Sequence, residues 1–418
     1  MKHLILYCFL ILAVLASCDS EINEPNTMPV QPSETGDTGH EKPTPFKMPM
    51  WSDSQLMVKD GMRSFSHVFL KKIVEGNNDN VIISPYGVHI GLSMIANAAD
   101  EKAKTEILHV INGRDLQSIN DFYRTFVSLM INADNQVKFI AANSLWTIPG
   151  LTPQQSFIEV MDNTYHADLF SEQINSAMAM QKINDWCSNA TNQMIQEFLK
   201  HPLDGTTVAA LFNALYFNGK WTTVFDPTCN TDEKFYGKKS EQQVEMMHAS
   251  RDMNCQQTED GIELSLPYGN GTFAINIFLP NENLTIEEYL NRRNNLSTVM
   301  VSRNARLSLP KFSLGYDNDD LASVLKSIGI RHIFESLSSI PLLSDGIALN
   351  TVQQSTKLKL DESGAEAAGA TGFYSQTASG DLPETLPTLD ININRPFIFS
   401  ITAYSDIVLF SGVIREIE

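Results

Sequence analysis

Asp361-Glu362-Ser363-Gly364-Ala365-Glu366-Ala367-Ala368-Gly369-Ala370-Thr371-Gly372 is the most informative stretch of this chain, because its composition suits neither an ordinary loop nor an ordinary strand. In an extended strand, successive side chains point to opposite faces. One face then carries only small, uncharged residues, namely Ala365, Ala367, Gly369 and Thr371; the other carries Glu366, Ala368, Ala370 and Gly372. A segment of this kind can slide between existing strands, since nothing bulky or charged blocks its first face. A flexible linker is the alternative, although linkers seldom lie between apolar strands so near a domain's C-terminal end.

The rest of the chain predicts helices first and strands later. Apolar residues recur at helical spacing from Phe65 to Ile73, and further helices are expected over 87–100, 102–111, 154–165, 178–198 and 321–328. Apolar runs predict strands over 81–83, 137–145, 208–217, 243–247, 262–266, 273–279 and 305–309. Helices followed by strands, rather than strict alternation, predict an α+β fold with a largely antiparallel sheet.

The first stretch resembles the hinge of the reactive-centre loop of the serpins, in the pattern Glu362-x-Gly364-x-Glu366-Ala367-Ala368-Gly369. Further motifs follow in that family's order over about 55–418: Asn80-Val81-Ile82-Ile83-Ser84-Pro85, Asn143-Ser144-Leu145-Trp146, Ile183-Asn184-x-Trp186, Asn213-Ala214-Leu215-Tyr216-Phe217-x-Gly219-Lys220-Trp221, Val244-x-Met246-Met247, Leu266-Pro267-Tyr268, Phe278-Leu279-Pro280, Leu309-Pro310-Lys311-Phe312, Arg395-Pro396-Phe397 and Leu409-Phe410-x-Gly412. Each motif alone is weak, but the ordered series is specific.

The resemblance implies a serpin domain over 51–418, with helices packed on a large central, mostly antiparallel sheet, smaller sheets and an exposed reactive-centre loop over about 362–389. In that family a serine protease cleaves the loop and forms an acyl-enzyme. The hinge then inserts as a new strand into a five-stranded sheet, and the distorted protease stays trapped. The expected partner is therefore a serine protease in a covalent complex. The inhibitor is expected to be a monomer, not an enzyme, and to need no cofactor and no metal.

The resemblance also assigns site residues. The hinge comprises Glu362, Gly364, Ala365, Glu366, Ala367, Ala368, Gly369 and Ala370. Trp221 matches the tryptophan of the breach, where insertion begins, and Lys311 pairs with Glu362 there. Ser84 and Asn213 match positions of the shutter, the region that holds the sheet closed lower down. Two residues depart from the family pattern: Gln354 stands where a shutter histidine is frequent, and Gly87 where a serine is common.

The scissile bond is placed by counting. In inhibitory serpins about 17 residues run from the hinge glutamate to the scissile position. Counting from Glu362 gives Ala378, followed by Ser379, with Thr377 as the next choice. A small residue at this position suits a protease with a shallow primary pocket, such as an elastase. Phe373 lies too near the hinge to leave a full-length inserted strand.

Two other functions stay open at this stage. A non-inhibitory serpin, acting as a binding or structural surface lipoprotein, would show a bulky, charged or proline residue in the hinge, and this hinge has none on its first face. A substrate-binding lipoprotein unrelated to serpins would explain the N-terminal leader over 1–17, but not the series of motifs.

The N-terminus predicts export and lipid attachment. Lys2 precedes an apolar run, and Leu15-Ala16-Ser17-Cys18 resembles a bacterial lipobox. Residues 1–17 are expected to be a lipoprotein signal peptide, Cys18 the lipidated residue and 18–50 a disordered tether, since this segment lacks apolar periodicity. The expected location is the cell envelope, at the outer membrane and facing the cell surface, or outside the cell.

Charge and motifs exclude other classes. The formal net charge of -19 opposes binding to nucleic acid, and the membrane is expected to be met only through Cys18. Gly269-x-Gly271 resembles a dinucleotide fingerprint, but a strand rather than a helix is expected to follow it. The nine histidines are dispersed, so no metal site is expected. Cys187, Cys229 and Cys255 are expected to be buried structural thiols.

Overall fold

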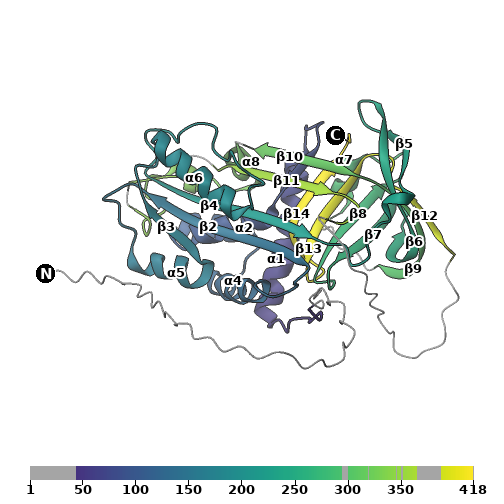
Figure 1. Ribbon diagram of the computed structural model, residues 1–418. Coiled ribbons are helices and arrows are strands. Elements are labelled where there is room, and N and C mark those ends of the chain that lie inside the picture. The colour runs from purple at the N-terminus through teal and green to yellow at the C-terminus, as the bar shows by residue number, and fades with distance from the viewer. Residues whose placement is uncertain are drawn as a thin grey trace, which may run out of the picture. The chain divides into compact units, whose positions relative to one another are not determined.

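Most of the described helices lie in the first half of the folded chain in this computed structural model, which describes residues 44–293, 300–318, 320–344, 346–349, 352–364 and 387–417 (Figure 1). The helices are α1 (Asp53–Val74), α2 (Pro85–Ala96), α3 (Glu101–Val110), α4 (Leu116–Met130), α5 (Gln155–Tyr165), α6 (Ala177–Ala190), α7 (Ile286–Arg292), α8 (Leu321–Ile328) and α9 (His332–Glu335), with a 3-10 turn, η1, at Pro227–Cys229. Side-chain caps start many of them. Ser52 and Gln55 form a capping box at α1, and Ser84 accepts a hydrogen bond from the amide of Gly87 at α2.

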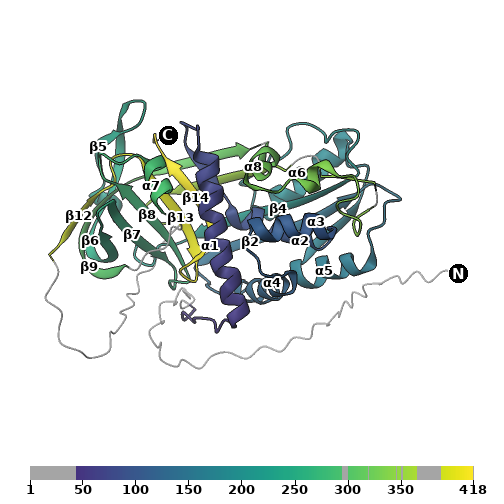
Figure 2. The ribbon, with the colours of Figure 1, turned by 180° about the vertical axis from the view of Figure 1, so that it is seen from behind.

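Helix α1 packs its apolar face on the strands that end the chain. Phe65 and Phe69 are buried and their rings stack with centroids 5.4 Å apart. Figure 2 shows α1 lying across β13 (Phe397–Ala403) and β14 (Ile407–Ile414), both of which are buried along their whole length. This layer forms the centre of the hydrophobic core.

The largest sheet of the described chain has nine strands, β1 (Val81–Ile83), β5 (Thr231–Tyr236), β6 (Glu241–Gln257), β7 (Gly261–Tyr268), β8 (Phe273–Pro280), β9 (Val301–Pro310), β12 (Leu389–Asn392), β13 and β14. Their order is β1-β14-β13-β8-β7-β6-β9-β12, and β5 pairs with β6. All neighbours are antiparallel except β12 and β9, which are parallel. The sheet is therefore mixed but mostly antiparallel.

Five further strands form two separate sheets. Strands β3 (Ala167–Ser171), β2 (Val137–Thr147) and β4 (Ala209–Gly219) make a three-stranded sheet, and β10 (Phe312–Asn318) pairs with β11 (Gln354–Leu360). In the described part of the chain no ladder joins β4 to β11. The single five-stranded sheet that the resemblance implied is thus split into two groups of strands, with the break between β4 and β11.

The α+β class and the large, mostly antiparallel sheet are confirmed, and most predicted elements exist with shifted ends. Helix α2 begins two residues before the predicted 87 because proline suits the first turn, and it ends at Ala96. The helix predicted over 178–198 ends at Ala190. Helix α4 was not predicted at all. As predicted, Gly269 and Gly271 lie in the turn before a strand, β8.

Candidate functional site: the start of the reactive-centre loop

The chain leaves β11 through a tight turn that is held against Trp221. The indole Nε1 of Trp221 donates to the carbonyl oxygen of Asp361 at 2.8 Å, and its backbone amide donates to the carbonyl of Ser363 at 3.0 Å. The amide of Phe225 donates to the carbonyl of Glu362 at 3.1 Å. Trp221 is buried, and its ring stacks on Tyr268 with centroids 4.4 Å apart. This packing fixes the tryptophan, so its two donors hold the loop start in one place.

Gly364 completes the turn and reverses the direction of the chain. Its φ of +98° lies where L-residues are strained, and a Cβ would lie 2.4 Å from the carbonyl oxygen of Gly219 and 2.5 Å from the amide nitrogen of Trp221. Gly364 also forms an antiparallel bridge with Lys220, the residue that follows β4. Only glycine allows this approach.

A charged cluster surrounds the side chain of Glu362. The Nζ of Lys311 lies 2.9 Å from one carboxylate oxygen of Glu362 and 3.0 Å from the carboxylate of Glu245. The Nδ2 of Asn230 donates to both Glu245 and Glu362. Burial alone would raise the pKa of Glu362, but hydrogen bonds from its own backbone amide, Lys311 and Asn230 outweigh burial and lower it. The carboxylate is therefore ionised and anchored.

A second junction lies at the start of helix α2. The amide of Ser84 donates to Oε1 of Gln354 at 2.8 Å, and Nε2 of Gln354 donates back to the carbonyl of Ser84 at 3.0 Å. The hydroxyl of Ser84 donates to the carbonyl of Leu409 on β14 at 2.7 Å. An amide side chain can donate and accept at once. Gln354 thus joins β11 to α2 by a reciprocal pair of bonds.

Asn213, on β4, belongs to the opposite side of this junction. Its Nδ2 donates to Oδ1 of Asn143 on β2 at 2.8 Å. Its Oδ1 is buried with no hydrogen-bond partner among the described residues, and a Cβ on Gly87 would lie 2.5 Å from it. The absence of a side chain at Gly87 therefore gives Asn213 its room. The structure brings Ser84 and Gln354 together, but no described bond joins either to Asn213.

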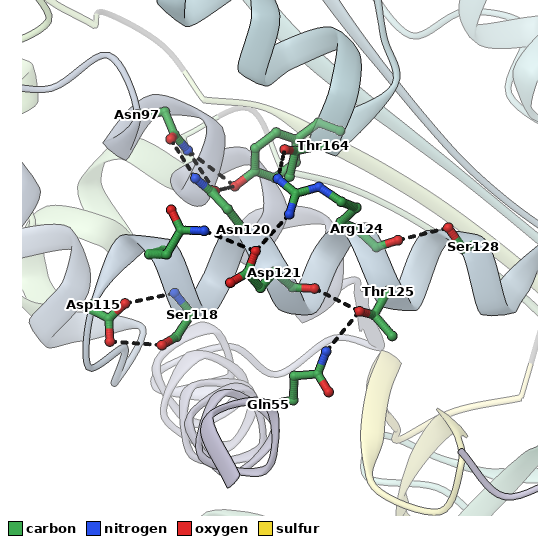
Figure 3. Close-up of polar contacts among 12 residues, drawn as sticks. Gln55, Asn97, Asp115, Ser118, Asn120, Asp121, Arg124, Thr125, Ser128 and Thr164 are labelled. Carbon is green, nitrogen blue, oxygen red and sulfur yellow. Dashed lines mark hydrogen bonds and ion pairs between the residues drawn. The ribbon is translucent and has the colours of Figure 1, made fainter. Parts of the chain in front are cut away.

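Polar contacts among helices extend from Asn143 into the layer behind the three-stranded sheet. Asn143 donates to the carbonyl of Tyr165, and the hydroxyl of Tyr165 donates to Asn120 on α4 at 2.7 Å. Asn120 and Asn97, at the end of α2, exchange amide hydrogen bonds, as Figure 3 shows. Arg124 joins α4 to Thr164 of α5 at 3.2 Å (Figure 3). These bonds hold α2, α4 and α5 as one support beneath β2 and β4.

Strands β4 and β11 flank this support and run in the same direction. Near α2, Asn213 approaches Gly87 while Gln354 bonds Ser84. Beyond the other end of both strands, Lys220 bridges Gly364. Both strands therefore run from the region of α2 toward Trp221, and their arrows point in the same direction in Figure 1. A strand continuing from Gly364 between them would be antiparallel to both.

Several predicted residues lie outside the described residues: Ala365, Glu366, Ala367, Ala368, Gly369 and Ala370 of the hinge, Thr377, Ala378 and Ser379 of the bait, and Cys18. In the part of the chain that is described, no three His, Cys, Asp or Glu side chains are placed to hold a metal ion. Cys187 and Cys255 are buried, and burial raises the pKa of the Cys187 thiol to about 12. The prediction for Cys229 was wrong: it is exposed because it ends the surface turn η1.

Sequence reasoning missed Asn230 and Glu245. Asn230, just before β5, donates to Glu362, and Glu245, within β6, shares Asn230 and Lys311 with it. No local motif marks either residue. Asn120 and Tyr165 were also missed, although Tyr165 precedes His166, whose left-handed conformation ends α5 and fixes the position of that side chain.

Comparison with known proteins decides the family. A family model described as serpin (serine protease inhibitor) matches residues 60–417. The chain belongs to the serpin family. Serine protease inhibitor 2 of Anopheles gambiae is 26% identical over 375 residues, covering 84% of this chain and 90% of that protein. Neuroserpin of Mus musculus is 25% identical, covering 82% of this serpin and 87% of the relative.

Solved structures show the same serpin fold. The native state of tengpin, a thermophilic serpin, matches with a TM-score of 0.76 and 23% identity over 90% of this chain and 97% of that chain. Human thyroxine-binding globulin, solved with its hormone, matches with a TM-score of 0.74 and 21% identity over 87% of this chain and 99% of that chain. The predicted serpin fold is thereby confirmed. Members of the family are typically protease inhibitors rather than enzymes.

Proposed function

We propose that this serpin traps a serine protease, of elastase-like specificity, through cleavage and insertion of the loop over about 362–389. The observation that carries the proposal is the antiparallel bridge between Lys220 and Gly364. The bridge lies at the end of two strands, β4 and β11, that run in the same direction but share no ladder in the described chain. The free edges of β4 and β11 expose backbone donors and acceptors that an added strand would satisfy.

The length of the loop supports the proposed bait. Ala378 is the fourteenth residue after Gly364, and β4 is eleven residues long. A segment from Gly364 to Ala378 would therefore pair along the whole of β4 before reaching the cleavage point. Cleavage after Phe373 would leave too short a segment.

The chemistry belongs to the protease. Its serine oxygen attacks the carbonyl carbon of Ala378, the bond to the nitrogen of Ser379 breaks, and the new amine leaves with the C-terminal peptide. The acyl-enzyme ester then joins the protease to the inhibitor. Insertion of residues 364–378 would carry the ester past α2 and beyond the start of β4 at Ala209. Deacylation needs an intact oxyanion hole, so distortion of the protease preserves the ester.

Location forms part of the proposal. The leader over 1–17 and the lipobox ending in Cys18 support a bacterial envelope lipoprotein that is held at the membrane through lipid on Cys18. Among the described residues, no helix has the length and apolar character to cross a membrane. A surface position would let the loop meet proteases outside the cell.

The experiment is to incubate the purified protein with pancreatic or neutrophil elastase and to analyse denaturing gels and released peptides. A complex stable in SDS, with a peptide that begins at Ser379, is the expected result. The variant Ala367→Glu places a charge on the inserted face and should be cleaved without trapping, because burying that charge opposes insertion. Ala368→Glu, on the other face, is the matched control. Cleavage without any complex, by proteases of several specificities, would favour a non-inhibitory serpin.

A further inference from the structure

Two carboxylates share the groups that anchor the loop start. The Nζ of Lys311 lies 2.9 Å from Glu362 and 3.0 Å from Glu245, and the Nδ2 of Asn230 donates to Glu362 at 2.5 Å and to Glu245 at 2.7 Å. One ammonium therefore faces two carboxylates, and the cluster formed by these four residues carries a net charge of about -1. Such a cluster holds each carboxylate less firmly than a simple ion pair would.

The two carboxylates differ in how they are attached to the fold. Glu245 lies on β6, and its carbonyl accepts a hydrogen bond from the backbone amide of Lys311 at 3.1 Å. This bond keeps Glu245 beside Lys311 whatever the loop does. Glu362 lies in the turn after β11 and stays in the cluster only while that turn is held by Trp221 and Phe225. Glu245 is thus a permanent partner of Lys311, and Glu362 a removable one.

We propose that Glu245 is a positioning residue that weakens the anchor of Glu362 and so sets how readily the loop start is released. Like charges near one ammonium repel, which opposes the binding of Glu362. When Glu362 departs, Lys311 and Asn230 keep Glu245 as an acceptor, so release leaves no unpaired charge at the site. The role in trapping rests on the proposed function; the competition for Lys311 and Asn230 does not.

The size of the effect follows from exposure. The side chain of Glu245 is 47% exposed and that of Glu362 14% exposed, so solvent screens their repulsion in part. Partly exposed charges typically change an equilibrium by about two- to fivefold. Replacing Glu245 by glutamine should therefore slow the opening of the loop start by about two- to fivefold.

The test is hydrogen exchange at the backbone amides of Trp221 and Phe225 in the uncleaved protein, because these amides bond the carbonyls of Ser363 and Glu362. E245Q should slow their exchange. E241Q is the matched control: Glu241 lies on the same strand and pairs with Lys234, away from the loop. E241Q should leave both amides unchanged. In an E362Q background, E245Q should have no effect, since the competing charge is gone.

Three outcomes overturn the inference: E245Q leaves the exchange rates unchanged, E245Q speeds exchange, or E245Q slows exchange equally in the E362Q background. The same variant should also raise the number of inhibitor molecules cleaved for each protease trapped, because slower release gives deacylation more time. If the unsubstituted protein forms no complex with any protease, the proposed function fails, while the exchange rates still decide the role of Glu245.

Discussion

Replacement of Gly364 by alanine should detach the loop start without harming the body of the protein. The residue has φ of +98°, where an L-residue costs about 1–2 kcal/mol. Its Cβ would lie 2.4 Å from the carbonyl oxygen of Gly219 and 2.5 Å from the amide nitrogen of Trp221, so backbone must move. The bond from Trp221 to Ser363 would then break, at a cost of about 1–3 kcal/mol. We expect a total of about 2–5 kcal/mol on the anchored state.

The assay is hydrogen exchange at the Trp221 amide, whose protection should fall by about 30- to 4,000-fold in G364A. Gly76→Ala is the control: its φ is +75°, nothing lies within 4 Å of the added Cβ, and the turn after α1 is remote in sequence from the loop. G76A should lower global stability by about 1–2 kcal/mol through the backbone cost alone. After cleavage and insertion, residue 364 would be extended, so G364A should then be as thermostable as the unsubstituted protein.

The reasoning fails if G364A leaves the Trp221 amide fully protected, because the turn would then not depend on the close approach at Gly364. It fails equally if G76A exposes that amide as much as G364A does. In that case the loss would report a general destabilisation and not the local anchor.

Three further predictions concern the anchors. Q354A removes the reciprocal bonds with Ser84 and should lower the free energy of unfolding in urea by about 2 kcal/mol; an unchanged midpoint would contradict this. The pKa of Glu362 is lowered in the folded state, so its stabilising contribution is complete above its ordinary pKa of 4.5 and is lost as the pH falls through the lowered value. Between about pH 6 and about pH 3, the free energy of unfolding measured in urea should therefore fall by about 1 kcal/mol more in the unsubstituted protein than in E362Q. An added side chain at position 87 crowds Asn213 in both G87S and G87A, but only the serine hydroxyl can donate to the unpartnered oxygen of Asn213. The free energy of unfolding in urea should therefore be about 1 kcal/mol higher for G87S than for G87A.

The sequence predicted those parts of the fold that depend on local pattern. Apolar runs located strands such as β8, and helical spacing over 65–73 located the buried side of α1. Val68, within that stretch, is exposed because it lies off the buried face. Helix α4 escaped notice because its apolar stripe is interleaved with polar residues such as Asn120, which is buried and hydrogen-bonded to Tyr165. Tertiary contacts, rather than composition, make that residue suitable there.

The contacts of the site were likewise predictable only in part. Family motifs predicted that Lys311 and Glu362 would meet, and the structure places them 2.9 Å apart. They could not predict Glu245, because its position depends on the register of β6 against β9 and on the end of β5. Nor could they predict that Gln354 would bond only the Ser84 side of the junction, since the free oxygen of Asn213 follows from side-chain packing against Gly87.

In the proposed mechanism, the resistance of the protein to loop insertion therefore depends on few contacts. The nine-stranded sheet and its buried helices hold the body of the protein together. Strands β4 and β11 pair along their other edges with β2 and β10, but they share no ladder with each other in the described chain. At one end Gln354 bonds Ser84, and at the other Trp221 holds the turn that ends at Gly364. Each such bond is worth about 1 kcal/mol, which is small beside the stability of a domain but large for a rate, because about 1.4 kcal/mol changes a rate tenfold. If the loop inserts as proposed, single substitutions at these ends should alter the speed of insertion while leaving the nine-stranded sheet intact, and this separation would allow one sequence to be both well folded and ready to change its fold.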